Sequence, residues 1–163
     1  MKARKSGFTL IEILIVVIIL GILAAIVIPQ FTEASSEARE STLVSNLHTL
    51  RSQIGLYKVQ HDDILPGDTS GDGAPDNAAN FEADLVGQTD VNGDVIGALD
   101  FGPYMQNIPE NPFITVDATP MFAIGAGAAP GDNSSHWYVD SVTGNIWAND
   151  SEANSDDIDH CEL

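Results

Sequence analysis

A nearly uninterrupted apolar run over residues 8–28 constrains the fold of this chain more than any other feature. Three residues in it are not strongly apolar, namely Thr9, Glu12 and Gly21. As a helix rising about 1.5 Å per residue, the run spans roughly 32 Å, close to the ~30 Å hydrocarbon core of a bilayer. Three bases precede it, Lys2, Arg4 and Lys5. The positive-inside rule therefore predicts one membrane-crossing helix with a cytoplasmic N-terminus.

Glu12 is the most informative residue of this run. A carboxylate in the middle of a bilayer costs on the order of 2.5–3.5 kcal/mol, so it is expected to have a partner. No basic side chain lies near it in the apolar run. Cleavage before Phe8 would create an α-amino group four residues from Glu12, on the same helix or on a neighbouring subunit. The alternative is a protonated carboxyl that the lipid tolerates.

Residues 6–12 read SGFTLIE, and the apolar run that follows leads to Pro29. This pattern resembles the class III signal of type IV pilins and type II secretion pseudopilins. The resemblance implies that a prepilin peptidase cuts after Gly7 and methylates the new amine of Phe8. It also implies that Glu12 pairs with the N-terminus of a neighbouring subunit during assembly. The pattern does not distinguish a pilin from a pseudopilin, or a major from a minor subunit.

The same resemblance implies a fold, a location and a set of partners. The fold is α+β and type IV pilin-like, with a long N-terminal helix packed on a small antiparallel β-sheet. The chain is expected to cross the bacterial inner membrane once, with a cytoplasmic N-terminus and a periplasmic head, before it joins a filament in the periplasm or at the cell surface. The implied partners are copies of itself, prepilin peptidase, an inner-membrane assembly platform, and minor pilins or pseudopilins.

Helical periodicity continues beyond the apolar run to about residue 60. Apolar residues there recur at spacings of three and four, which places them on one helix face; they are Leu43, Leu47, Leu50, Ile54 and Tyr57. Three segments are predicted: a basic leader over 1–7 that is removed, an apolar assembly helix over 8–30, and a head over 31–163. Within the head, the helix ends near 60, and it is followed by a loop over 61–112, a sheet over about 113–148 and an acidic tail over 149–163.

Strand patterns are confined to the last third of the chain. Residues 136–148 read as a β-hairpin whose turn ends in Gly144, with residues 120–125 as its antiparallel neighbour. A smaller hairpin is compatible with Val91 and Val95-Ile96 around Asn92-Gly93. Residues 101–113 resemble the loop that precedes the sheet in major pseudopilins, with three apolar anchors, Tyr104, Ile108 and Phe113.

The charge balance is strongly acidic, with 24 Asp and Glu against six Lys and Arg and a net charge of −18. Without residues 1–7, three bases remain against 24 acids, a net charge of −21. Nucleic acid is therefore not an expected partner, because phosphate binding requires clustered bases. Such a surface is instead expected to be soluble and open to divalent cations.

Two acidic spacings in the long loop are compatible with Ca²⁺. Asp68, Asp72 and Asp76 lie four residues apart around glycine turns, and residues 90–94 have the 1,3,5 oxygen spacing that opens EF-hand-like loops. Ordinary turns are the alternative, since Asp, Asn and Gly are common turn residues. The acidic tail is expected to be disordered and solvated, although its Asp150, Asp156 and Asp157 loosely resemble the Ca²⁺-binding aspartates of major pseudopilins.

No pattern in the sequence indicates catalysis. The histidines are scattered without metal-ligand pairing, and there is no nucleophile elbow, phosphate loop or paired-cysteine motif. A lone Cys161 cannot form an intrachain disulfide. The chain is expected to be a structural subunit that polymerises through its N-terminal helix into a type IV pilus-like or type II secretion pseudopilus filament. The alternative is a minor pilin-like subunit whose acidic loops bind Ca²⁺, the one candidate cofactor, or a surface ligand.

Overall fold

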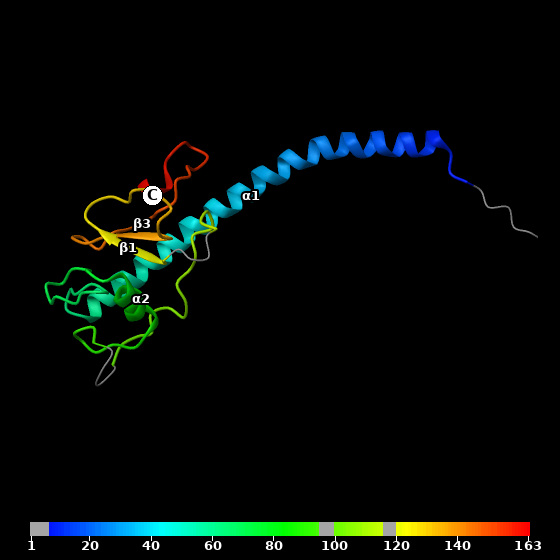
Figure 1. The fold of residues 1–163 in the computed structure, drawn as a ribbon. Helices are drawn as coiled ribbons and strands as arrows, with labels where there is room; N and C mark the ends of the chain where they lie inside the picture. The colour runs from blue at the N-terminus through cyan, green and yellow to red at the C-terminus, as the bar shows by residue number, and fades with distance from the viewer. Residues whose placement is uncertain (1–6, 95–99, 116–119) are drawn as a thin grey trace, which may run out of the picture. The chain divides into compact units, whose positions relative to one another are not determined.

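The computed structural model describes residues 7–94, 100–115 and 120–163. Most of the predicted leader and Val95-Ile96 of the predicted small hairpin therefore lie outside the described residues. The elements in chain order are α1 (Leu10–Gln60), α2 (Ala78–Val86), β1 (Phe122–Gly125), β2 (Trp137–Asp140), β3 (Ile146–Ala148) and the 3₁₀ helix η1 (His160–Glu162), as Figure 1 shows. The chain divides into two units, Met1–Ala38 and Arg39–Leu163.

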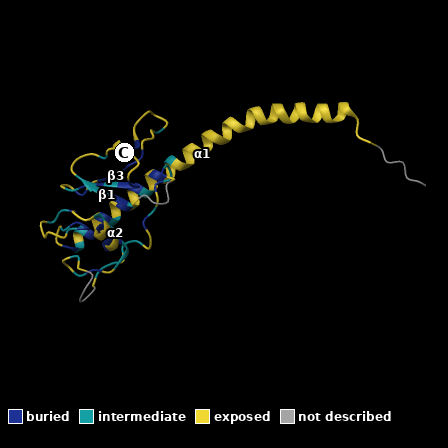
Figure 2. Cartoon of the chain, viewed as in Figure 1, coloured by how far each residue is buried: buried dark blue, intermediate teal, exposed yellow. Residues whose placement is uncertain are grey.

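The described part of the first unit consists of Gly7 to Thr9 and the N-terminal half of α1. Every described residue of this unit is exposed (Figure 2). The helix continues through Pro29, whose missing N–H leaves one helical hydrogen bond unmade. The Thr32 hydroxyl donates to the Ile28 carbonyl in the next turn. The predicted long N-terminal helix is confirmed.

The second unit has one hydrophobic core, built on the C-terminal part of α1. The five residues of the predicted stripe are all buried in it, at 0–5% exposure: Leu43, Leu47, Leu50, Ile54 and Tyr57. Side chains from α2 and all three strands pack into the same core as the stripe, among them Phe81, Leu85, Phe122, Trp137 and Ile146. The predicted anchors take part as well, since Ile108 is buried and Tyr104 and Phe113 are partly buried against this core.

The three strands form a mixed sheet in the order β1-β2-β3. The predicted hairpin is confirmed, because β2 and β3 pair antiparallel with Trp137 opposite Ala148. The predicted antiparallel pairing of residues 120–125 is wrong: β1 pairs parallel with β2, with Phe122 beside Trp137. The connection over residues 126–136 is a crossover that returns the chain to the starting end of the sheet, as parallel pairing requires.

The turn between β2 and β3 is closed by the carboxylate of Asp140. It accepts hydrogen bonds from the backbone N–H groups of Val142 and Thr143 and from the Thr143 hydroxyl. It also accepts one from the N–H of Gly127, in the crossover that follows β1. These bonds, led by that of the Thr143 hydroxyl, hold the pKa of Asp140 below its ordinary value. One side chain therefore joins the hairpin turn to the crossover.

The long segment before the sheet is more regular than the sequence pattern suggests. It contains α2, which begins at the N-cap Asn77; the Asn77 side chain accepts hydrogen bonds from the N–H groups of Ala79 and Asn80. An isolated antiparallel bridge joins Thr89 to Phe101. These short elements provide the order in the described residues of this connection.

The acidic tail is ordered, which differs from the expected disorder. A bridge joins Ala153 to Asp159, and the tail ends in η1. Asp150 and His160 are completely buried. Arg51 on α1 donates hydrogen bonds to the carbonyl oxygens of Ile146 and Leu163. Specific contacts of a few polar groups therefore fix a segment whose composition alone is typical of disorder.

Candidate functional site

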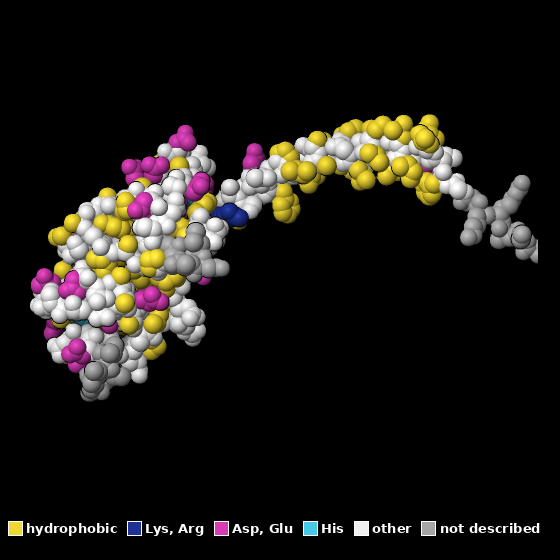
Figure 3. Space-filling view, viewed as in Figure 1, with side chains coloured by type: hydrophobic (Ala, Val, Ile, Leu, Met, Phe, Trp, Pro, Cys, Tyr) yellow, Lys and Arg dark blue, Asp and Glu magenta, His cyan; other side chains and the backbone are white. Residues whose placement is uncertain are grey.

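The N-terminal half of α1 presents apolar side chains without cover. The large apolar residues between Phe8 and Phe31 are 49–84% exposed, and Figure 3 shows them along the visible side of this part of the helix. This half of α1 is long and apolar enough to cross a membrane, by length and composition. A helix that is apolar all round is stable only inside lipid or among other helices. The segment is therefore the first candidate site, and what it requires is an apolar environment.

The helix begins in a capping box made by Thr9 and Glu12. Oε2 of Glu12 accepts hydrogen bonds from the backbone N–H and the hydroxyl of Thr9, at 2.7 and 2.6 Å. The N–H of Glu12 donates in return to the Thr9 hydroxyl at 3.4 Å. This reciprocal pattern satisfies N–H groups that a helix start leaves open. Both bonds to the carboxylate use Oε2, and no donor among the described residues bonds to Oε1.

Thr9 was missed as a functional residue, although a recognisable pattern marks it. Ser or Thr followed three residues later by Glu, immediately before an apolar run, is a capping signal. Glu12 therefore has a partner within its own chain, the N–H and hydroxyl of Thr9, although no basic side chain lies near it in the sequence. The pairing of Glu12 with an N-terminal amine stays a prediction.

Glycine at position 7 has no packing explanation in the structure. A Cβ built there would meet no atom within 4 Å, and its φ lies outside the left-handed region. The same holds for Gly21. Phe8 is 80% exposed and makes no core contact. The described fold therefore does not require glycine at position 7 or an aromatic side chain at Phe8.

Residues 2–28 match the family model described as the prokaryotic N-terminal methylation motif. The resemblance to prepilin-type proteins is confirmed. The prepilin-type segment contains Gly7, Phe8 and Glu12, and the match ends one residue before Pro29.

Curated relatives match the chain over longer stretches than this motif. The chain is 39% identical over 61 residues to the type II secretion system core protein G of Dickeya chrysanthemi, covering 37% of this chain and 40% of that protein. The corresponding protein of Aeromonas hydrophila is 38% identical over 60 residues, covering 37% and 42%. The type IV major fimbrial protein FimA of Dichelobacter nodosus is 36% identical over 96 residues, covering 54% and 60%.

These similarities are partial. The chain spans about two fifths of the length of the secretion proteins that it matches. No solved structure matches the chain. The two kinds of relative are named as a secretion-system core protein and a major fimbrial protein.

The predicted Ca²⁺ residues of the long loop are occupied by turn hydrogen bonds. The Asp68 carboxylate accepts from the N–H groups of Ser70, Gly71 and Gly73, at 2.8–3.0 Å. Partial burial raises the pKa of Asp68, but these donors together hold it below its ordinary value. The Asp72 carboxylate accepts a hydrogen bond from the N–H of Ala74. The Asp76 carboxylate accepts from the N–H and the hydroxyl of Thr69.

The structure does not bring Asp68, Asp72 and Asp76 together around one point. Within residues 7–94, 100–115 and 120–163, no group of three or more Asp, Glu, His or Cys side chains is placed to hold a metal ion. In the second predicted loop, the Asp90 carboxylate accepts from the N–H groups of Asn92 and Asp94, as in an ordinary Asx turn. Binding of Ca²⁺ by the first loop stays a prediction.

The tail aspartates do not form the site that their resemblance suggested. Asp150 is buried, and its two oxygens bind Nδ1 of His160 and Nδ2 of Asn111, each at 2.6 Å. Asp156 and Asp157 are exposed. Asp150 therefore has a structural role: it joins the tail to the loop that precedes the sheet.

Two further features of the buried interior were not indicated by any motif: the carboxylate of Asp84 and the ring pair Tyr57–His61. Asp84 on α2 is 6% exposed, and its Oδ2 accepts the N–H of Gly67 at 2.8 Å. Tyr57 and His61 stack face to face on α1, with ring centroids 3.8 Å apart, and Nε2 of His61 bonds to the Thr89 hydroxyl. One sequence signal was available for Asp84. It lies three residues after Phe81, which places a carboxylate on the apolar face of a short helix.

Proposed function

We propose that this chain is a structural subunit that polymerises through the N-terminal half of α1 into a type IV pilus-like or type II secretion pseudopilus-like filament. The observation that carries the proposal is the exposure of every large apolar residue between Phe8 and Phe31. Lipid provides the required environment before assembly, and the packed helices of other subunits provide it afterwards. The similarity to a secretion-system core protein and a major fimbrial protein supports the same role.

Processing of the N-terminus belongs to this proposal. A prepilin peptidase would cut between Gly7 and Phe8 and methylate the amine of Phe8. The match to the methylation motif supports this step. So does the open space around Gly7, because the fold itself does not require glycine there.

Glu12 would link successive subunits. In the separate chain, the capping box satisfies Oε2, and the positive end of the helix dipole favours the carboxylate. The methylated amine of a neighbouring Phe8 would donate to the open Oε1. The amine and Glu12 would then compensate each other's charge in an apolar filament core, where an unpaired charge is costly.

The proposed location follows from the same segment. The chain would cross the inner membrane once, with its N-terminus in the cytoplasm and residues 31–163 in the periplasm, and would then join the filament. Its proposed partners are copies of itself, prepilin peptidase, an inner-membrane assembly platform and minor subunits. No step of this role involves catalysis by the chain itself.

Mass spectrometry of the chain taken from sheared filaments and from membranes tests this function. The expected filament form lacks residues 1–7 and carries one extra methyl group on Phe8. The expected membrane pool contains the same processed form. An intact N-terminus in both fractions, or absence of the chain from filaments, would contradict the proposal.

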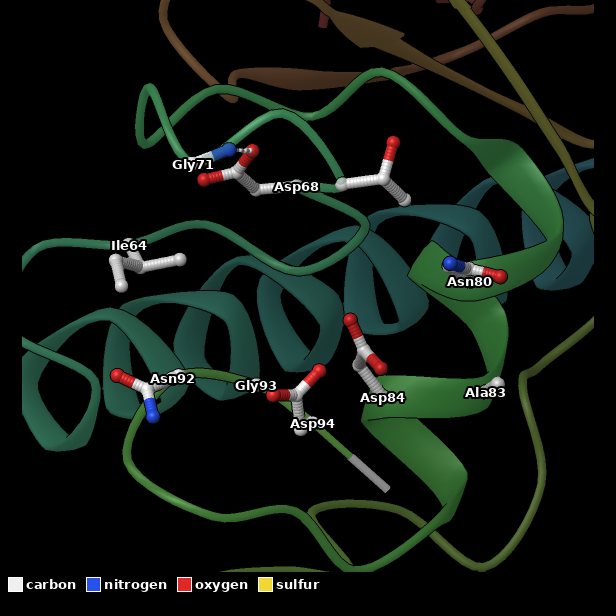
Figure 4. A pocket seen from close by; sticks show the side chains of 10 residues that line it. Ile64, Asp68, Gly71, Asn80, Ala83, Asp84, Asn92, Gly93 and Asp94 are labelled. Atoms are coloured by element: carbon white, nitrogen blue, oxygen red, sulfur yellow. Dashed lines mark hydrogen bonds between the residues drawn. The ribbon is translucent and has the colours of Figure 1, made fainter. Parts of the chain in front are cut away.

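A second candidate function is that of a minor subunit whose acidic head binds a cation or a surface ligand. The observation that favours it is a cavity of about 580 Å³ in the head (Figure 4), whose lining includes the carboxylates of Asp68, Asp84 and Asp94. The abundance of the chain separates the two roles, because a major subunit dominates purified filaments and a minor one does not.

A further inference from the structure

A groove of about 310 Å³ lies on the head, lined by the last turns of α1 and by the turn between β2 and β3. Two bases of α1 line it, Arg51 and Lys58, and so does Gly55 between them. Its apolar lining includes Ile54 and Leu65. The groove therefore offers positive charge beside an apolar surface, which suits an anionic segment that also carries an apolar side chain.

The bases that follow the predicted leader lie on α1 and lack acidic partners. They are Arg39, Arg51 and Lys58, and 20 of the 24 acids come after them in the sequence. Among the described residues, none of these bases forms an ion pair with an Asp or Glu side chain. Arg51 donates to two carbonyl oxygens, which leave its charge uncompensated. In a chain with so many acids, unpaired bases beside a groove point to a partner on another molecule.

Gly55 is an independent sign that another molecule approaches this face. Glycine inside a helix lowers its stability relative to alanine, because glycine loses more backbone freedom on folding. A Cβ at this position would meet no atom within 4 Å, so the packing of the head does not require glycine there. Glycine on a helix face is typical of a place where a neighbouring chain comes close.

A complementary surface is found in the acidic tail. Residues 154–158 form a turn, the tail turn, in which the Asn154 side chain accepts the N–H groups of Asp156 and Ile158. Asp156 and Asp157 are exposed, and Ile158 beside them is 42% exposed. The large apolar side chains exposed after α1, among the described residues, are Val91, Val142 and Ile158. Of these, Ile158 directly follows two exposed carboxylates.

The tail turn and the groove are separated along α1. The Ser155 hydroxyl donates to Oε2 of Glu40, which lies at the start of the part of α1 that belongs to the second unit. Arg51 and Lys58 follow Glu40 by 11 and 18 residues, which is about 17 and 27 Å along the helix. The tail turn of a second copy, displaced along the helix, can therefore reach a groove that its own chain leaves unfilled.

We propose that the groove docks the tail turn of a second copy of this chain, with Arg51 and Lys58 facing Asp156 and Asp157, and with Ile158 against the apolar lining. The inference rests on the proposed function, because it names a contact between heads in that filament. The contact is heterologous, since each copy offers its groove to one neighbour and its tail turn to another. Such contacts generate open helical polymers when the rotation between copies does not close a ring.

Charge reversal in the full chain, followed by the yield of sheared filaments, tests the contact. Reversal is more informative than removal, because an exposed ion pair contributes little and its loss is easily missed. Lys58→Glu and Asp156→Lys should each lower the yield on the order of tenfold, since each places like charges opposite each other. The two changes in one chain should restore most of the yield, because opposite charges then face each other again.

Asp72→Lys is the matched control, because Asp72 is an exposed acid outside both surfaces. Combined with Lys58→Glu, it should not restore the yield. Normal filaments from Lys58→Glu, or equal restoration by Asp72→Lys, would overturn the docking. Absence of filaments from the unmodified chain would instead contradict the proposed function.

Cross-linking tests the docking in membranes as well as in filaments. Copies with Asn145→Cys in the groove and copies with Ser155→Cys in the tail turn are produced together, both with Cys161→Ser. Oxidation should join them into a species of twice the mass. Thr49→Cys, on α1 but outside the groove, replaces Asn145→Cys as the control and should give no such species. No cross-link in either fraction, or equal cross-linking of the control, would overturn the docking.

Gly55→Leu separates docking from folding. The side chain would meet no atom of its own head within 4 Å of its Cβ, and leucine is a better helix former than glycine, so the thermal midpoint of the unassembled chain should not fall. The filament yield should fall on the order of tenfold, because the side chain occupies space that the partner needs. Ser52→Leu, on α1 outside the groove, should assemble normally. Normal assembly of Gly55→Leu would show that no neighbour enters the groove.

Discussion

Nδ1 of His160 lies 2.6 Å from Oδ1 of Asp150, and both side chains are completely buried. Asp150 follows β3, and His160 begins the 3₁₀ helix at the end of the tail. The other oxygen of Asp150 accepts from Asn111, whose own N–H donates to Nδ1 of His136. Burial lowers the pKa of His136. One carboxylate therefore connects the tail, the sheet and the loop before the sheet.

Replacement of His160 by Ala should destabilise the head. The change removes a buried partner of Asp150 and leaves Oδ1 with the N–H of Glu152 as its hydrogen-bond donor, at a cost of about 1–3 kcal/mol. Asp157→Asn is the matched control, because Asp157 is exposed in the same tail, and it should have little effect. Urea unfolding of the full chain in detergent, followed by tryptophan fluorescence, gives the two midpoints. Equal midpoints for the two variants would show that the pair does not stabilise the tail.

Leu50→Ala should be among the more destabilising single changes in the second unit. Leu50 is 0% exposed at the centre of the stripe, and truncation of such a residue costs about 2–5 kcal/mol through lost burial and a residual cavity. Leu56→Ala on the exposed side of the same helix removes the same atoms, but Leu56 is 45% exposed. A much smaller loss is expected there. The same urea midpoints measure both, and comparable losses would be evidence against the stripe as the centre of the core.

Stability should fall in acid in a way that depends on Asp140. Its pKa is lower in the folded chain than the ordinary value of 3.8. The unfolded chain then binds the proton more readily, so this contribution is complete above the ordinary pKa and is lost as pH falls through the lowered one. Asp84 affects stability in the opposite direction. Its pKa is raised in the folded chain, so its contribution to the free energy of unfolding is lost as pH rises.

The measurement is the thermal midpoint between pH 2.5 and 6, for the unmodified chain and for Asp140→Asn, in chelator. The variant should show a shallower loss toward acid, since the asparagine side chain does not titrate. If the thermal midpoint of Asp140→Asn fell as steeply toward low pH as that of the unmodified chain, carboxylates other than Asp140 would account for the loss of stability in acid.

Glu12→Leu should leave the chain inserted and processed but prevent assembly. Leucine stabilises the helix in lipid, so an assembly defect could not be attributed to lost insertion. Thr9→Ala separates the two roles of the carboxylate. It removes the cap, at about 0.5–2 kcal/mol of helix stability, but retains Oε1 for a neighbour. Filaments are counted after shearing, with Glu33→Ala as a control further along the helix, and normal filaments from Glu12→Leu would exclude the proposed pairing.

Gly7→Asp should leave residues 1–7 attached to the chain. The structure offers no steric reason for this effect, because the position is open, so it would report on recognition by the peptidase. Gly21→Ala, at an equally open position inside the helix, should be processed normally. Electrophoretic mobility and intact mass distinguish the two forms, and a processed Gly7→Asp chain would place the cut elsewhere.

The sequence alone predicted the parts of the fold that repeat a pattern over many residues. The spacing of Leu43 to Tyr57 implied a buried face over four turns, and all five side chains are buried. The hairpin that contains Trp137 and Trp147 followed from two β-prone segments around a turn that ends in Gly144. In both cases, the prediction depends on residues that lie close together in the sequence.

The remaining features depend on contacts between distant residues. Alternation of side chains marks β1 as a strand but carries no information about direction, so its parallel pairing with β2 was not predictable. The helix α2 has nine residues, which is too short for a firm periodic signal. Asp84, Asp150 and His160 are polar, and composition assigns such residues to the surface until partners far along the chain are known.

The exposed, apolar N-terminal half of α1 also affects whether the proposed filament can disassemble. Lipid and a bundle of neighbouring helices withdraw nearly the same apolar area from water, so the hydrophobic effect contributes almost equally to both states. Transfer between them is then close to balanced, and small polar terms at Glu12 and between heads decide its direction. A subunit that leaves the filament would return to the membrane intact. Filament growth and shortening would then use the same pool of membrane subunits.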